Sequence, residues 1–237
     1  MPIALITGGS RGIGYAIACY LASKDYDIIL VAKNKQRLIK AKTSLNEIYP
    51  KINVSIYRCH FADLSCVEQL IDRLLMLHST IDILVNSAGI LSTDFIEADG
   101  NAIENLFNIN VTSSLIMTNK VAQRMQRQQH GTIFILSSNA AMTALPKIGL
   151  YSATKAAILN YSESLFKALL PHNVKVTCLC PSVVDTDMTN DGRIANEDKI
   201  HTDDIVKAVD FTLSLSPSAL LPQMTILCRP IEMEKLK

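Results

Sequence analysis

Short, almost continuous apolar runs alternate along the chain with segments whose apolar residues recur at helical spacing. Strands of a parallel sheet have this apolar character when both faces are covered, because neither face meets water. Repeated alternation of strand and helix is typical of right-handed βαβ crossovers. The expected strands occupy residues 3–7, 27–32, 54–59, 81–86, 131–137, 174–180 and 224–228. The pattern predicts an α/β fold: a single doubly wound domain over residues 1–237, with a parallel seven-stranded sheet and helices on both faces.

Composition excludes several classes of partner. The net charge of +1 gives no general attraction to nucleic acid or to an anionic membrane. No apolar run approaches the roughly 20 residues of a membrane span, and the first residues carry no basic segment typical of a signal peptide. We therefore expect a cytoplasmic protein. The cysteines form no C-x-x-C motif, so we expect free thiols and no metal site; they are Cys19, Cys59, Cys66, Cys178, Cys180 and Cys228.

A glycine-rich turn, "TGGSRGIG" (7–14), joins the first expected strand to the first expected helix. Gly8, Gly12 and Gly14 can let the backbone turn tightly, approach a pyrophosphate and pack the helix on the strand. The N–H groups at the start of the helix, with their partial positive charge, would face the phosphates. A turn that only joins two elements is the alternative. Its place in the first strand–turn–helix unit favours a dinucleotide-binding Rossmann domain.

The glycine spacing and a series of later motifs resemble the short-chain dehydrogenase/reductase family. The resemblance covers about residues 3–190 and is closest to the members that act as 3-oxoacyl-carrier-protein reductases. The motifs stand in the family's order: Asp63 in "FADLS", "NSAG" at 86–89, Asn110 in "NINVT", Ser138 in "LSSNAA", Tyr151, Lys155, and "CPSVVDTDM" at 180–188.

The resemblance implies a set of cofactor-binding residues. Asp63 would bond the adenine amine and also suits a helix entry, whereas Asn86 would brace the strands beneath the cofactor. Two positions depart from the family pattern, because Ser87 stands for the usual Asn and Ser182 for the usual Gly. The full set is Gly8, Ser10, Arg11, Gly12, Ile13, Gly14, Lys33, Asp63, Asn86, Ala88, Gly89, Tyr151, Lys155, and Pro181, Val184 and Thr186, the last three lining the nicotinamide carboxamide.

The end of the second expected strand indicates which dinucleotide is bound. An NAD-binding chain usually carries an acid there to hold the adenosine ribose. Here Ala32 and Lys33 follow the strand, and Arg11 lies in the glycine turn. Two cations and no acid favour the 2′-phosphate of NADP(H), through charge-assisted hydrogen bonds. Two ordinary surface cations are the alternative.

Tyr151 precedes Lys155 by one helical turn, which places the two side chains on one face. Reduction of a carbonyl leaves an alkoxide that needs a proton, and a free tyrosine has a pKa near 10. A neighbouring ammonium group should lower this pKa and make Tyr151 a general acid or base. By resemblance Lys155 also holds the nicotinamide ribose. The alternative is a core tyrosine with a lysine stem beside it.

Two further residues complete the expected catalytic set. Ser138 follows the fifth strand, thirteen residues before Tyr151, and its hydroxyl can donate to the substrate oxygen. Ser137 is the rival, and a cap role is open to either serine. In the family an asparagine such as Asn110 opens its helix and holds a water that relays protons to the lysine. Asn110 in an apolar helix would be costly to bury without partners.

These features predict an NADP-dependent oxidoreductase that transfers hydride between nicotinamide and a carbonyl or secondary alcohol. A dinucleotide-binding redox sensor without catalysis is the alternative, whereas a nucleotide-sugar epimerase would need a larger C-terminal part. The expected substrate is a small molecule, and a polar segment at 185–199 is a surface loop or a lid. Apolar surface on helices 100–125 and 149–170 predicts a homodimer or homotetramer. The candidate substrate pocket is mostly apolar: Ala140, Leu145, Ile148, Val183 and Met188.

Overall fold

A seven-stranded parallel sheet forms the centre of the protein. The computed structural model describes residues 1–93, 95–143, 145–234 and 236. The strand order is β3-β2-β1-β4-β5-β6-β7, and every pairing is parallel, as the sequence predicts. The order reverses between β1 and β4, and ligands of such sheets bind outside the carboxyl ends of the strands at this point. The strands are β1 (Ile3–Thr7), β2 (Asp27–Ala32), β3 (Val54–Arg58), β4 (Ile83–Asn86), β5 (Gly131–Leu136), β6 (Val174–Pro181) and β7 (Gln223–Ile226).

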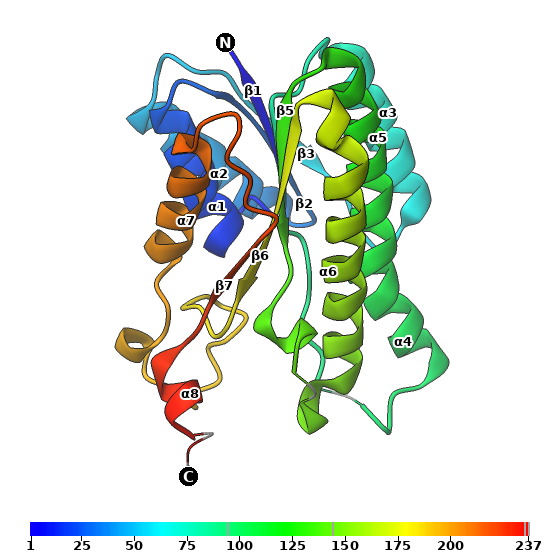
Figure 1. Ribbon diagram of the computed structural model, residues 1–237, viewed down its shortest axis with the longest axis vertical. Helices are drawn as coiled ribbons and strands as arrows, with labels where there is room; N and C mark the ends of the chain where they lie inside the picture. Colours follow the sequence, from blue (N-terminus) through cyan, green and yellow to red (C-terminus); the bar gives the residue numbers. More distant parts are fainter. Residues whose placement is uncertain (94, 144, 235, 237) are drawn as a thin grey trace.

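Helices cover both faces of the sheet (Figure 1). On one face lie α1 (Gly12–Ser23), α2 (Lys35–Ile48) and α7 (Thr202–Ser214). On the other lie α3 (Leu64–Leu77), α5 (Ser113–Gln128) and α6 (Gly149–Leu169). The shorter elements are α4 (Gly100–Phe107), the π-helical turn η1 (Asn108–Thr112), the 3₁₀ turns η2 (Asn139–Ala141), η3 (Pro146–Ile148), η4 (Leu170–His172) and η5 (Asn196–Asp198), and α8 (Arg229–Glu234).

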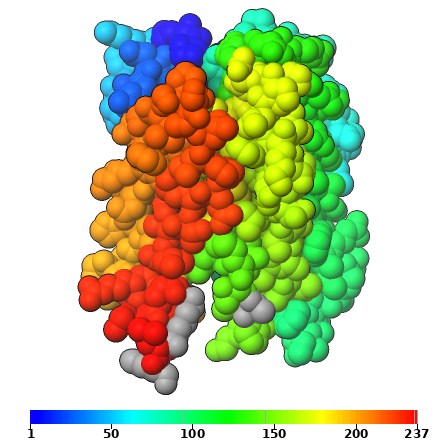
Figure 2. Space-filling view, in the orientation of Figure 1, coloured from blue at the N-terminus to red at the C-terminus, as the bar shows by residue number. Residues whose placement is uncertain are grey.

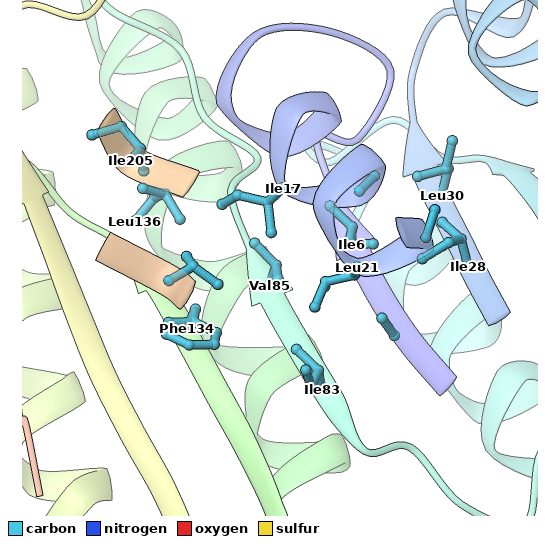
Figure 3. Packing of buried hydrophobic residues seen from close by; sticks show 14 of the residues in the cluster. Ile6, Ile17, Leu21, Ile28, Leu30, Ile83, Val85, Phe134, Leu136 and Ile205 are labelled. Carbon is cyan, nitrogen blue, oxygen red and sulfur yellow. The ribbon is translucent and has the colours of Figure 1, made fainter. Parts of the chain in front are cut away.

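Alternate residues of the strands from β1 to β6 enter two separate hydrophobic clusters, one on each face, whereas β7 contributes to one cluster only. In β1, Ile6 belongs to the cluster under α1, and Leu5 belongs to the cluster under α3, α5 and α6. Figure 3 shows Ile17 and Leu21 of α1 packed over the central strands, close to Ile6 and Val85. Each fully buried Leu or Ile contributes about 1.5–3 kcal/mol. The apolar runs of the central strands are continuous because both of their faces are buried, whereas the edge strands β3 and β7 are more exposed.

The polar segment at 185–199 is held at both of its ends. Val184 pairs with Ile200 in an isolated parallel bridge. The side chain of Ile194 is buried, and the Nζ of Lys199 donates to the carbonyl of Thr189 at 2.9 Å. The loop is therefore packed against the body along part of its length.

The C-terminal segment from α7 to α8 forms one side of the face in Figure 2, and α6 forms the other. Among the helices of the described residues, none has the length and apolar character needed to cross a membrane.

Candidate active site

The loops after β1, β2, β3, β4 and β6 line a cleft of about 430 Å³ at the carboxyl edge of the sheet. Nine of the expected cofactor residues line it: Gly8, Ser10, Arg11, Gly12, Ile13, Lys33, Ala88, Gly89 and Thr186. Seven others lie outside the lining: Gly14, Asp63, Asn86, Tyr151, Lys155, Pro181 and Val184.

The glycine turn leaves the start of α1 open toward the cleft. Gly8 and Gly12 have φ angles of 67° and 56°, in the left-handed region that favours glycine. A Cβ on Gly14 would lie 2.8 Å from the carbonyl oxygen of Gly8, so this glycine permits close packing of helix on turn. No side chain caps α1, whose N-cap residue is Arg11. The first N–H groups of α1 can therefore donate hydrogen bonds to an anion.

Two residues outside the cleft lining organise the strand ends beneath it. The Oγ1 of Thr7 donates to Asn86 Oδ1 at 3.0 Å and accepts from the backbone N–H of Ala88 at 3.1 Å. The amide of Asn86 also donates to Ser114 Oγ at 2.8 Å and Thr118 Oγ1 at 2.9 Å. Asn86 is 3% exposed, so its bonds join β1, β4 and α5.

Asp63 begins α3. Its Oδ1 accepts the backbone N–H of Cys66 at 3.0 Å, which is a helix N-cap bond. The residue is exposed. The helix-entry role expected for Asp63 is therefore present.

Three cations from three elements line one end of the cleft: Arg11, Lys33 and Arg37. Arg11 and Arg37 both pair with the carboxylate of Asp187, Arg37 at 3.4 Å. The hydrogen bond from Arg11 and its charge lower the pKa of Asp187. Within the described part of the chain Lys33 makes no ion pair. This end of the cleft is suited to an anion.

Tyr151 and Lys155 lie on α6, beside the end of β5. Burial raises the pKa of Tyr151, and a hydrogen bond with Ser138 opposes this increase. Burial lowers the pKa of Lys155 to about 8, and its Nζ donates to the carbonyl of Leu136 at 2.9 Å. The ammonium lies 5.7 Å from the centre of the Tyr151 ring. The expected lowering of the tyrosine pKa by Lys155 is thus not found, because burial is the largest cause of the pKa shift of both groups.

The two candidate serines have different partners. Ser137 donates to the backbone carbonyl of Lys155 at 2.8 Å, which ties β5 to α6. Ser138 bonds Tyr151, and its Oγ also accepts the N–H of Ala140 at 3.1 Å, which caps η2. Ser138 therefore contacts the tyrosine and has the cap role as well.

Asn110 lies in the π-helical turn η1 and is 1% exposed. Its Oδ1 accepts the N–H of Ile90 at 2.8 Å, and its Nδ2 donates to Thr154 Oγ1 at 3.1 Å. These bonds satisfy the buried amide and connect the segment after β4 to α6. A Cβ on Gly89 would lie 3.3 Å from Asn110 Oδ1 and 3.5 Å from Lys155 Nζ. The cleft and the catalytic candidates are therefore contiguous at Gly89.

The segment after β6 also borders the cleft, through Thr186, Asp187 and Met188. Pro181 ends β6, and the side chain of Val184 is buried. Among the described residues the non-glycine positions with positive φ lie elsewhere, so Ser182 carries no strain of this kind. Its Oγ is buried without a hydrogen-bond partner. Thr186 faces the glycine turn, where a Cβ on Gly12 would lie 3.3 Å from its Cγ2.

Several lining residues were not expected from the sequence. Arg37 follows the N-cap Asn34 by three residues, and Asn34 Oδ1 accepts the N–H of Arg37 at 2.9 Å. The position of Arg37 in the basic segment "KNKQR", directly after a strand, could have indicated that it contributes to the cleft. Phe61 lies in "FADLS" and Asp187 in "CPSVVDTDM", but neither motif assigned a role to these two residues, and His60 lies in no motif. Within the described ranges no cluster of His, Cys, Asp or Glu could hold a metal ion.

Comparison with known proteins agrees with this arrangement. The model of the short chain dehydrogenase family matches residues 2–197. The chain is 31% identical over 231 residues to an oxidoreductase of Staphylococcus saprophyticus, covering 97% of each. Among solved structures, a β-ketoacyl-[ACP] reductase from Bacteroides thetaiotaomicron is 28% identical, with a TM-score of 0.85 and 98% of each chain covered. A short chain dehydrogenase from Burkholderia cenocepacia, solved in complex with NADP, is 26% identical, with a TM-score of 0.83 and 95% of each chain covered. The chain belongs to the short-chain dehydrogenase family of oxidoreductases.

Proposed function

We propose that this chain, as a single domain over residues 1–237, is an NADP-dependent reductase of a carbonyl compound, or a dehydrogenase of the corresponding secondary alcohol. The observation that carries the proposal is the position of Gly89. This glycine lines the cleft and lies against both Asn110 and Lys155. A dinucleotide along the cleft would therefore end beside the partly buried Tyr151 and the buried Lys155.

The cleft fits NADP(H) at both of its ends. Arg11, Lys33 and Arg37 supply the cations for a 2′-phosphate, and the first turn of α1 supplies N–H groups for the pyrophosphate. Asp63 and Asn86 keep the roles implied by the family, toward the adenine and beneath the strands. Pro181, Val184 and Thr186 would border the nicotinamide end. When bound, NADP(H) supplies the hydride.

The chain's own residues would handle the proton. Tyr151 Oη donates the proton to the substrate oxygen in reduction and accepts it in oxidation. Ser138 donates a hydrogen bond where negative charge develops. Lys155 holds the ribose and, when protonated, favours the phenolate of Tyr151. Asn110 holds the Gly89–Ile90 segment against α6, and a water beside it would connect Lys155 to solvent.

The proposed substrate is a ketone or a 3-oxoacyl compound. The cleft lining also includes the apolar Ile90, Ile109 and Met188, which suit an uncharged carbonyl chain. The likeness to the β-ketoacyl-[ACP] reductase supports the 3-oxoacyl class. All six cysteines are free thiols, which suits the reducing cytoplasm.

Turnover separates this proposal from a redox sensor that only binds the dinucleotide. The purified chain should consume NADPH, followed by its absorbance, with at least one member of a panel of aliphatic, aryl and 3-oxoacyl ketones. Tight NADPH binding with no turnover across the panel would favour the sensor. A chain that binds neither NADPH nor NADH would exclude both.

A further inference from the structure

Cys59 and Cys66 lie with their sulfur atoms 3.0 Å apart, outside the catalytic set. Cys59 follows β3 and is 1% exposed, whereas Cys66 lies in the first turn of α3 and is partly exposed. A disulfide joins sulfur atoms at about 2.05 Å. The two thiols therefore need to approach by only about 1 Å to be joined.

The segment between the two cysteines forms part of the cleft. His60 and Phe61 line it, and Asp63 caps α3 through the N–H of Cys66. The N–H of Cys59 donates to the carbonyl of Ala32 at 3.1 Å. A covalent link between the cysteines would thus act on the end of β3, the start of α3 and the wall between them.

We propose that a hydroperoxide converts Cys59 and Cys66 into a reversible disulfide, and that this bond weakens NADP(H) binding by moving the His60–Phe61 wall. The second half of this inference rests on the proposed function. The site is a thiol modification site at the adenine end of the cleft, where it acts on the cofactor without contact with the catalytic residues.

The chemistry balances with the peroxide as oxidant. Cys66 is the more exposed residue of the pair, and its thiolate attacks the peroxide oxygen. The O–O bond breaks and Cys66 becomes a sulfenic acid, while the released alkoxide or hydroxide takes up the proton that the Cys66 thiol gave up and leaves as an alcohol or water. The sulfur of Cys59 then attacks the sulfur of Cys66. The S–O bond breaks, the hydroxide takes the Cys59 proton, and water leaves as the disulfide forms. A dithiol such as dithiothreitol reverses the bond by exchange.

A second pair of neighbouring thiols, on β6, serves as a control for the selectivity of oxidation. Cys178 and Cys180 lie 3.8 Å apart on β6, with both side chains buried in the core. Peroxide must reach a thiol before it can oxidise it, and Cys66 is partly exposed whereas Cys178 and Cys180 are both buried. On this ground of access we expect oxidation at Cys66 and Cys59 before it occurs at the β6 pair.

Mass spectrometry tests the modification on the full reduced chain after brief treatment with hydrogen peroxide. The wild type should lose the mass of two hydrogen atoms, and peptide mapping should join Cys59 to Cys66. Cys59→Ala should instead hold a sulfenic acid at Cys66 that dimedone traps, whereas Cys66→Ser should show neither product. Cys19→Ser, at another partly buried cysteine, should behave as the wild type. Loss of two hydrogen atoms in Cys66→Ser, or none in the wild type, would overturn the site.

The Kd for NADPH, measured before and after oxidation, tests whether the disulfide weakens cofactor binding. Oxidation should raise the Kd for NADPH by about 5- to 150-fold, the usual range of coupling between two sites, and dithiothreitol should restore it. Reciprocally, saturating NADP⁺ should make the disulfide harder to form in a glutathione redox buffer by the same factor. An unchanged Kd in the oxidised chain would overturn the coupling. If the reduced chain bound no NADPH, the proposed function and the coupling would both fail, while the mass measurement would still decide the disulfide.

Discussion

Lys155 keeps its amino group in the interior of the protein, at the junction of α6 and β5. The side chain is 6% exposed, and burial lowers its pKa from 10.5 to about 8. Between these two values the unfolded chain binds the proton more tightly than the folded chain does. The stability of the fold therefore rises as pH increases through this window.

This linkage can be measured against Lys155→Met, which keeps the length of the side chain without its charge. From about pH 7 to about pH 9.5, the free energy of unfolding of the wild type should rise relative to the variant by about 2 kcal/mol. Denaturant unfolding at both pH values gives the difference. If the difference in the free energy of unfolding between wild type and variant stayed constant or fell as pH rises, the amino group of Lys155 would not have a lowered pKa.

Ser138 and Ser137 form a matched pair for mutation. Ser138 bonds Tyr151, whereas Ser137 bonds the backbone of Lys155. Ser138→Ala should lower kcat by about 10²–10³-fold, as the loss of one donor to a developing oxyanion does. Ser137→Ala should mainly lower thermal stability. Steady-state kinetics and thermal unfolding of both variants decide the assignment, which fails if Ser137→Ala has the larger loss of kcat.

At the scale of elements, the cation end of the cleft is assembled by the β1–α1 turn, the β2–α2 turn and the loop after β6. Asp187 of that loop pairs with Arg11 and Arg37. A 2′-phosphate would compete with this carboxylate for the same guanidinium groups. The loop after β6 and the cofactor are therefore coupled through charge.

Asp187→Asn should tighten NADPH binding by about 2- to 5-fold, because an exposed ion pair contributes at most about 1 kcal/mol. Its effect on NADH, which lacks the phosphate, should be small. We expect the wild type to bind NADPH about 30- to 1,000-fold more tightly than NADH, and this preference should shrink as the salt concentration rises. Lys33→Asp should remove most of the preference. Fluorescence titration with both cofactors measures these effects. Weaker NADPH binding in Asp187→Asn would show that the ion pair supports the site.

At the scale of the whole molecule, α6 presents exposed alanines away from the sheet. They are Ala153, Ala156 and Ala157. We expect the face of α6 that carries them to form the interface of a homodimer or homotetramer. Light scattering at micromolar concentration should report an oligomer, and Ala157→Glu should dissociate it, whereas Thr43→Glu on the exposed side of α2 should not. A monomeric wild type would contradict the expectation.

The topology could be predicted from the sequence because it depends on local patterns. Two-sided burial makes strands such as β1 apolar throughout. The glycines of the turn indicate directly where the backbone needs a positive φ angle or close packing. The proximity of Cys59 to Cys66 and the contribution of Arg37 depend on how separate elements pack, so single motifs did not reveal them. The direction of the Tyr151 pKa was missed for the same reason, since burial is a property of the folded chain.

In the proposed reaction the partly buried Tyr151 supplies the proton for NADPH-dependent carbonyl reduction. The most direct test compares wild type and Tyr151→Phe in two measurements: the Kd for NADPH and the turnover of the best ketone from the panel. In Tyr151→Phe we expect the Kd for NADPH to stay within about threefold of the wild-type value, a change of less than 1 kcal/mol, while turnover falls to the background rate. Turnover above a few per cent of the wild-type kcat, with binding intact, would show that another group supplies the proton.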